Sequence, residues 1–133
     1  MTNSFLAGLR VLVVEDEFMI AMLIEETLVD RDCVVVGPFT NVPDALQAAE
    51  HTTLDGAVLD VNLRGEKVYP VAEMLASRGI PFLLLSGYGN DAIPANRPTW
   101  RACSKPFSPA DLIGMLAEQI RSEAASRSDG APA

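Results

Sequence analysis

The sequence predicts an α/β fold, a (βα)5 doubly wound domain in which helices cover both faces of a five-stranded parallel sheet. Five apolar runs rich in β-branched residues begin at residues 9, 33, 57, 80 and 101, so 24, 24, 23 and 21 residues separate successive starts. Each interval holds one helix and two short loops, and in most of them the apolar period changes to about 3.6. Continuous apolar strands that alternate with amphipathic helices are typical of a parallel sheet buried on both faces.

The predicted strands are the apolar runs themselves. They are residues 9–14, 33–36, 57–61, 80–85 and, more weakly, 101–104. The first three runs are uninterrupted, which favours central or near-central strands, because a strand buried on both faces shows no polar alternation.

The predicted helices lie between these runs and carry apolar residues at helical spacing. The apolar faces are Ile20, Leu23, Ile24 and Leu28; Val42, Ala45, Leu46 and Ala49; Val68, Val71, Ala72, Leu75 and Ala76; and Ile113, Leu116, Ala117 and Ile120. Ser108 can cap the last helix, and Pro109 fits its first position. Two glycines and two prolines interrupt residues 87–99, so we expect at most a short helix and a mobile loop there.

Length and composition predict one domain, at residues 9–121. With 133 residues, 49% of them hydrophobic and 21% charged, the chain is long enough to bury a core and too apolar for disorder. We expect residues 1–8 to be a short N-terminal extension and residues 122–133 to be a flexible tail. The longest apolar run has seven residues, so we expect no membrane span, no secretory signal and a cytoplasmic protein.

The net charge of −8 narrows the range of partners. Nucleic acids and anionic membranes attract basic surfaces, so neither is an expected partner of this chain. Two cysteines are too few for a disulfide scaffold or a four-cysteine zinc site. Only Lys67 and Lys105 among the ten cations are lysines, so a lysine at the end of a predicted strand is unusual here.

Polar side chains stand at the ends of four predicted strands. Glu15 and Asp16 follow the first strand, Asp60 ends the third, Ser86 follows the fourth and Lys105 follows the fifth. In an open parallel sheet, ligands bind beyond the carboxyl ends of the strands. We therefore expect these side chains to form a site at that edge.

The chemistry of this set favours a hard cation. Carboxylates a few ångströms apart repel one another by about 4 kcal/mol per pair at an effective dielectric constant of about 20. Such a cluster persists in water with raised pKa values, or around a cation. Oxygen ligands without histidine or cysteine favour Mg²⁺ over Zn²⁺. A flavin or nucleotide site is disfavoured, because the first turn has three consecutive acids and no glycine.

At these residues the chain resembles the receiver domains of two-component response regulators, over about residues 9–121. The matching segments are Leu-Val-Val-Glu15-Asp16-Glu, Leu-Asp60-Val-Asn62-Leu, Ser86-Gly87-Tyr88 and Lys105-Pro106-Phe107. The resemblance implies a flavodoxin-like fold with strand order 2-1-3-4-5 and a cis Lys105–Pro106 peptide. It implies that Asp60 is the phosphoacceptor and that Ser86 and Lys105 contact the phosphoryl group. Mg²⁺ would be held by Glu15, Asp16, Asp60 and the backbone carbonyl of Asn62.

Within this family the chain is similar to the single-domain FAT GUY receivers, some of which act in bacterial stress signalling. The segment Pro81-Phe82-Leu-Leu-Leu-Ser86-Gly87-Tyr88-Gly89 carries the likeness, with Leu-Leu-Ser86 where Phe-Ala-Thr is usual. Typical receivers have an aromatic switch residue three positions before the lysine, where this chain has Ala102. We hypothesise that Tyr88 or Trp100 replaces it.

The resemblance implies a phosphoacceptor switch, with only slow self-phosphorylation and self-dephosphorylation, and not an enzyme. A histidine kinase or phosphotransfer protein would supply the phosphoryl group. The signal would pass through protein contacts at residues 91–119 or through phosphoryl relay, from a monomer or weak dimer. The alternative is a metal-dependent phosphohydrolase with an aspartate nucleophile, in which a second aspartate commonly lies two residues after the first. This chain has Asn62 there.

Overall fold

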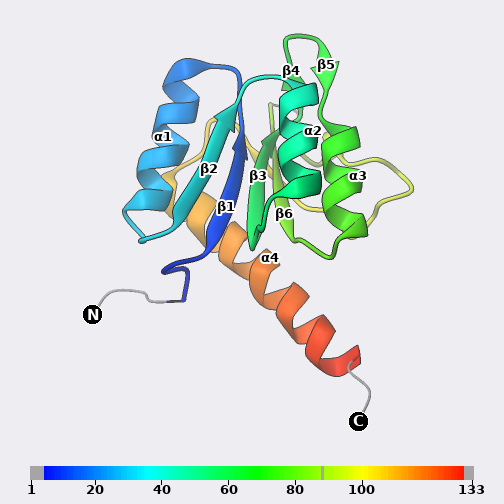
Figure 1. Ribbon diagram of the computed structural model, residues 1–133. Coiled ribbons are helices and arrows are strands. Elements are labelled where there is room, and N and C mark those ends of the chain that lie inside the picture. The colour runs from blue at the N-terminus through cyan, green and yellow to red at the C-terminus, as the bar shows by residue number, and fades with distance from the viewer. Residues whose placement is uncertain (1–4, 88, 131–133) are drawn as a thin grey trace.

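A five-stranded sheet forms the centre of the computed structural model, which describes residues 5–87 and 89–130 (Figure 1). Its strands are β1 (Arg10–Val14), β2 (Val34–Phe39), β3 (Gly56–Asp60), β6 (Phe82–Ser86) and β7 (Ala102–Ser104). All neighbouring strands are parallel, and their order is β2-β1-β3-β6-β7. Counted along the chain, these five strands have the order 2-1-3-4-5, which confirms the predicted flavodoxin-like fold class.

Helices cover both faces of the sheet (Figure 1). The α-helices are α1 (Phe18–Val29), α2 (Val42–His51), α3 (Tyr69–Ser77) and α4 (Pro109–Gly130). In β1, Leu12 and Val14 pack with α2 and α3, whereas Val11 and Val13 pack with α1 and α4. Successive side chains of a strand point to opposite faces, so burial on both faces requires the continuous apolar run seen in the sequence.

Strand β2 lies at the edge of the sheet, and the prediction that it is central or near-central is wrong. Val34 is 43% exposed, and the strand continues through Gly37 and Pro38 to Phe39. Proline is tolerated in an edge strand because a missing N–H on the outer side loses no ladder hydrogen bond. The β-branched run of β2 therefore reflects strand propensity and not burial on both faces.

The connection between β6 and β7 contains the 3₁₀ helix η1 (Gly89–Ala92) and no α-helix among its described residues. This confirms the expectation of at most a short helix in residues 87–99. Pro94 and Pro98 follow η1, and neither has the N–H that would continue a helix.

The folded domain extends beyond residues 9 and 121 at both ends. Leu6 is fully buried against α1 and α4, so the chain preceding β1 packs onto the domain. Helix α4 continues to Gly130, where the sequence predicts a tail from residue 122 onward. Residues 122–126 contain only Ser, Glu and Ala, and nothing in them ends a helix that has already formed.

A short hairpin follows β3 and is absent from the sequence prediction. Its strands β4 (Asn62–Leu63) and β5 (Glu66–Lys67) pair antiparallel, and Arg64 and Gly65 join them with φ values of 54° and 90°. Two positive φ values in a two-residue loop are typical of a type I′ turn. The Gly65 N–H donates to Asn62 Oδ1 at 3.0 Å, and the hairpin carries Arg64 at its tip.

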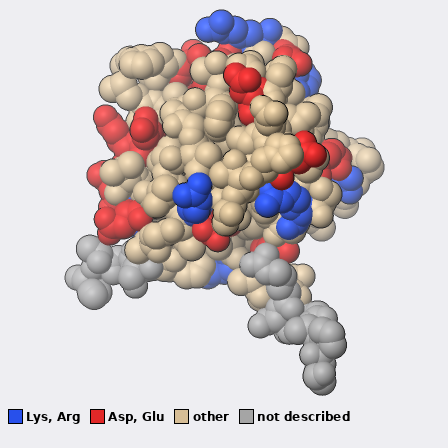
Figure 2. All heavy atoms as spheres, viewed as in Figure 1, with Lys and Arg blue, Asp and Glu red and all other residues tan. Residues whose placement is uncertain are grey.

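Charged side chains of both signs occupy the face shown in Figure 2. Asp and Glu gather most densely along the left side of that view, and a basic group stands at its top. The net charge of −8 is therefore not concentrated in a single acidic patch on this face. Within residues 5–87 and 89–130, no helix has both the length and the apolarity needed to cross a membrane.

Candidate functional site

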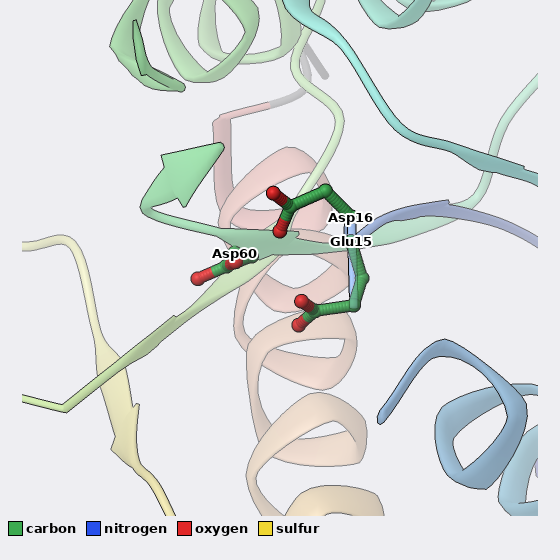
Figure 3. Close-up of side chains that lie close together, drawn as sticks. All are labelled: Glu15, Asp16 and Asp60. Atoms are coloured by element: carbon green, nitrogen blue, oxygen red, sulfur yellow. The ribbon is translucent and has the colours of Figure 1, made fainter. Parts of the chain in front are cut away.

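Three carboxylates meet beyond the carboxyl ends of β1 and β3 (Figure 3). Glu15 and Asp16 directly follow β1, and Asp60 is the last residue of β3. The two strands are parallel neighbours with Val14 beside Leu59, so the residues that come next reach the same edge of the sheet. One oxygen of each carboxylate lies within 4.8 Å of the others. The structure therefore brings together the three acids singled out in the sequence.

Glu15 is completely buried. Its Oε2 accepts the Glu17 N–H at 3.1 Å, whereas its Oε1 accepts no well-directed hydrogen bond from any described residue. Oε1 has only an ion-pair contact, with the Lys105 ammonium at 3.1 Å. Burial raises the pKa of Glu15 to about 7, and the nearby negative charge of Asp60 adds to this effect. The buried position of Glu15 therefore destabilises its ionised form.

Lys105 faces two of the three acids. Its Nζ lies 3.1 Å from Glu15 Oε1 and 3.2 Å from Asp60 Oδ1, and its side chain is 19% exposed. Burial lowers the pKa of Lys105, but the charges of Glu15 and Asp60 outweigh it and raise the pKa above its usual value. The ammonium therefore stays charged between the two carboxylates. The peptide between Lys105 and Pro106 is cis, as predicted.

The remaining residues of the predicted site lie next to Asp60 along the chain or at the end of the neighbouring strand. The Asn62 N–H points at Asp60 Oδ1 from 3.4 Å, so the backbone of Asn62 lies beside the carboxylate. Ser86 is 3% exposed and ends β6, the neighbour of β3. The Lys105 N–H donates to the Ser86 carbonyl oxygen at 2.9 Å, which ties the ends of β6 and β7 together at the site.

Arg64 is a site residue that the sequence analysis missed. Its Nε lies 3.4 Å from Asp16 Oδ2; the Asp16 side chain is 10% exposed and the Arg64 side chain 80% exposed. The left-handed conformation of Arg64 in the β4–β5 turn brings it to this position. The signal that predicts such a turn is the Asn62-Leu-Arg64-Gly65 segment, with glycine at a position that needs positive φ.

The donor set fits Mg²⁺. The three clustered side chains offer only carboxylate oxygens, which suit a hard divalent cation. The fully buried Glu15 Oε1 accepts no well-directed hydrogen bond from the described residues and has only the Lys105 ammonium beside it, so it is an atom that a cation would bind. Like charges this close repel one another, and a divalent cation removes that repulsion together with the cost of burying Glu15.

Three acids and a lysine beyond the strand ends of a doubly wound α/β sheet define a domain with the layout of a receiver. Residues 11–117 match the model of the response regulator receiver domain family. The chain belongs to this family, as the sequence resemblance predicted.

Solved structures show the same relationship. The solution structure of SdrG from Sphingomonas melonis Fr1 is 38% identical over 90% of this chain and 99% of SdrG, with a TM-score of 0.74. The BeF3-activated conformation of SdrG from Pseudomonas melonis Fr1 is 36% identical over 90% and 99% of the two chains, with a TM-score of 0.70.

A more distant similarity shows the fold alone. The receiver domain of the sensor histidine kinase PA1611 from Pseudomonas aeruginosa PAO1, with a magnesium ion coordinated in its active site cleft, is 23% identical. The match covers 86% of this chain and 99% of that domain, with a TM-score of 0.70. A comparison with curated proteins gave no match. The FAT GUY subgroup stays a prediction.

The hypothesis that Tyr88 or Trp100 replaces the missing aromatic switch can be compared with the structure only at Trp100. Tyr88 lies outside the described residues. Trp100 is 7% exposed and packs edge-on against Phe82, with ring centroids 5.0 Å apart and planes at 78°. Ala102, at the usual position of the switch, is buried in β7. Trp100 is therefore a core residue next to the position where the family normally has its aromatic.

Proposed function

We propose that this protein is a single-domain cytoplasmic response regulator that accepts a phosphoryl group on Asp60 in a Mg²⁺-dependent reaction. The observation that carries the proposal is the position of Asp60 at the end of β3. Its Oδ1 lies 3.2 Å from the Lys105 ammonium, and Glu15 and Asp16 complete the cluster. In a chain of the receiver family, this arrangement supports phosphoryl transfer to Asp60.

Asp60 supplies the nucleophile. One carboxylate oxygen attacks the phosphorus of a phosphohistidine, and the O–P bond forms as the P–N bond breaks. The imidazole nitrogen keeps the electron pair of the broken bond and takes a proton from water. Lys105 balances charge on the transferring group, and the Ser86 hydroxyl donates to a phosphoryl oxygen once the group is on Asp60.

The Mg²⁺ ligands would be the carboxylates of Glu15, Asp16 and Asp60 and the backbone carbonyl of Asn62. When bound, the ion neutralises charge that develops on the phosphoryl oxygens. The all-oxygen donor set and the buried Glu15 Oε1, which accepts no well-directed hydrogen bond from the described residues, support this assignment. The chain's own part is to hold these ligands on rigid strand ends, beside the lysine.

The phosphoryl donor would be a histidine kinase or a phosphotransfer protein. At the rim of the site, Phe18 and Met19 begin α1 with exposed fractions of 75% and 73%. Phe18 lines a hollow together with Glu15 and Asp16, and such exposed apolar side chains suit docking of a donor protein. Output would pass through residues 91–119 or by phosphoryl relay, in stress signalling, from a monomer or weak dimer.

A metal-dependent phosphohydrolase is the competing function. It needs a general acid near the nucleophile, and the residue two positions after Asp60 is Asn62. An amide cannot donate a proton as an acid does, and Asn62 Oδ1 already accepts the Gly65 N–H. We therefore propose a phosphoacceptor with slow self-phosphorylation and self-dephosphorylation, and not a hydrolase.

Incubation with acetyl phosphate and Mg²⁺, followed by intact-protein mass spectrometry, tests the proposal. We expect a gain of one phosphoryl group in the wild type and none in Asp60→Asn or in EDTA. Glu50→Gln removes an exposed carboxylate in the last turn of α2, at the opposite edge of the sheet from the cluster, and should leave the gain unchanged. An adduct that persists in Asp60→Asn, or rapid multiple turnover of phosphomonoesters, would contradict the proposal.

A further inference from the structure

Residues 89–101, which we call the strap, connect β6 to β7. The strap begins three residues after Ser86 and ends four residues before Lys105, so both of its ends adjoin the candidate site. Its internal backbone hydrogen bonds are short turns, such as Arg97 N–H to the Pro94 carbonyl at 2.9 Å and Trp100 N–H to the Arg97 carbonyl at 3.2 Å. Because the strap has no α-helix, its position depends on contacts with the rest of the domain.

Helix α3 holds the strap at two points. The Tyr69 hydroxyl donates to the Ala92 carbonyl oxygen. One helical turn further, Glu73 forms a two-point ion pair with Arg97, in which Arg97 Nε lies 2.9 Å from Oε2 and a terminal guanidinium nitrogen contacts Oε1. Residues four apart on a helix share one face, so Tyr69 and Glu73 form a single attachment surface for the strap.

Arg97 links this attachment to the core. Its guanidinium carbon lies 5.4 Å from the centre of the Trp100 ring, so one side chain contacts both Glu73 and Trp100. Two surface hollows, of about 480 and 410 Å³, border Trp100. The indole is buried against Phe82 and has open space beside it, which gives it room to turn outward.

We propose that the Glu73–Arg97 pair is a latch that holds Trp100 in the core while Asp60 is unmodified, and that phosphorylation of Asp60 opens it. This inference rests on the proposed function. Asp60 and Ser86 end neighbouring strands, and the strap begins three residues after Ser86, so a phosphoryl group on Asp60 would add bulk and charge close to the start of the strap.

The Glu73–Arg97 ion pair favours the closed position of the strap by only a small free energy, so a change at the site can open it. The Arg97 and Glu73 side chains are 41% and 44% exposed, and ion pairs in that setting contribute little in water. Segments with few internal hydrogen bonds open more readily than the core of a domain. Since Ala102 cannot act as an aromatic switch, Trp100 on the strap is the aromatic group placed to report the state of Asp60 to the surface.

Trp100 is the only tryptophan in the chain, so its fluorescence reports on the strap alone. We expect acrylamide to quench Trp100 about two- to fivefold more efficiently after addition of Mg²⁺ and beryllofluoride, because quenching follows the open population. Glu73→Gln should produce much of this rise without beryllofluoride and reduce the further response. The exchanged pair Glu73→Arg with Arg97→Glu should restore protection. Glu66→Gln, an exposed acid on β5, should behave as the wild type.

Phosphorylation of the same samples separates the latch from the proposed function. If acetyl phosphate modifies Asp60 but Trp100 stays protected, the latch is wrong and the proposed function stands. If Glu73→Gln leaves quenching unchanged while its melting temperature stays at the wild-type value, the ion pair does not hold the strap. If Asp60 accepts no phosphoryl group and binds no beryllofluoride, both inferences fail.

Discussion

Arg64 contacts Asp16, one of the carboxylates of the proposed metal site. Its guanidinium lies 3.4 Å from a carboxylate that belongs to the acidic cluster, and the Arg64 side chain is 80% exposed. A cation must displace this contact or bind beside it. We therefore expect Arg64→Ala to bind Mg²⁺ about two- to fivefold more tightly, which corresponds to the loss of one exposed ion pair. Isothermal titration calorimetry at low salt measures the change.

Lys67→Ala provides the matched control for Arg64. Lys67 lies on the same hairpin, and its loss removes the same charge from the same part of the surface. Equal gains in both variants would mean that general charge, and not the Asp16 contact, sets the affinity. Weaker binding in Arg64→Ala would show that the arginine supports the metal site.

The acids of the cluster could be located from sequence and Arg64 could not. Glu15, Asp16 and Asp60 stand at the ends of strands, and the ends of parallel strands converge by geometry alone. The position of Arg64 depends on a hairpin of two-residue strands, which is too short to produce an apolar period. Only Gly65 marks the turn, and a single glycine does not specify where the preceding side chain will point.

The conformation of β2 at its bulge requires glycine at position 37. Between Leu12 and Val14 of β1, β2 has one more residue than a regular ladder allows, so a bulge lies next to Gly37. Gly37 has a φ of 111°, and a Cβ there would lie 2.8 Å from the Val13 carbonyl oxygen. Gly37→Ala should lower the free energy of unfolding by about 1–3 kcal/mol or more, which urea denaturation measures.

Gly114→Ala is the matched glycine substitution. Gly114 lies in α4, and a Cβ there would have no neighbour within 4 Å. Alanine should raise the free energy of unfolding by about 0.5–1 kcal/mol, because it restricts the unfolded chain and favours helix. Similar losses in both variants would mean that the crowding at Gly37 is not the cause.

The elements show what a periodic pattern can and cannot predict. Apolar runs predict all five strands of the sheet, and in the central strands β1, β3 and β6 burial on both faces requires such runs. The same kind of run in β2 led to a wrong position, since β-branched residues also suit an exposed edge, as Val34 shows. Residues 122–126 carry no apolar face that would predict a helix, yet α4 extends through them because a helix of Ser, Glu and Ala propagates once a packed helix precedes it.

The whole domain is affected by the charge buried at its site. The folded state raises the pKa of Glu15 from 4.5 to about 7, mainly by burial, so it binds a proton that the unfolded chain has released. In the absence of metal, the free energy of unfolding contributed by Glu15 should therefore fall as the pH rises from 4.5 to about 7. Lys105 adds no slope there, because its raised pKa keeps it protonated in both states throughout this window.

Comparison with Glu15→Gln isolates this contribution from the other titrating groups. In EDTA, urea denaturation should show that the free energy of unfolding of Glu15→Gln rises relative to that of the wild type by about 1–3 kcal/mol between pH 4.5 and about 7. The reason is that glutamine carries no charge to bury. Saturating Mg²⁺ should reverse the order above pH 7, because the cation binds the ionised Glu15 and stabilises the folded wild type more than a variant that keeps only Asp16 and Asp60. A constant difference between the two proteins in EDTA would mean that burial does not raise the pKa of Glu15. A slope in EDTA with no reversal in Mg²⁺ would place the cation elsewhere.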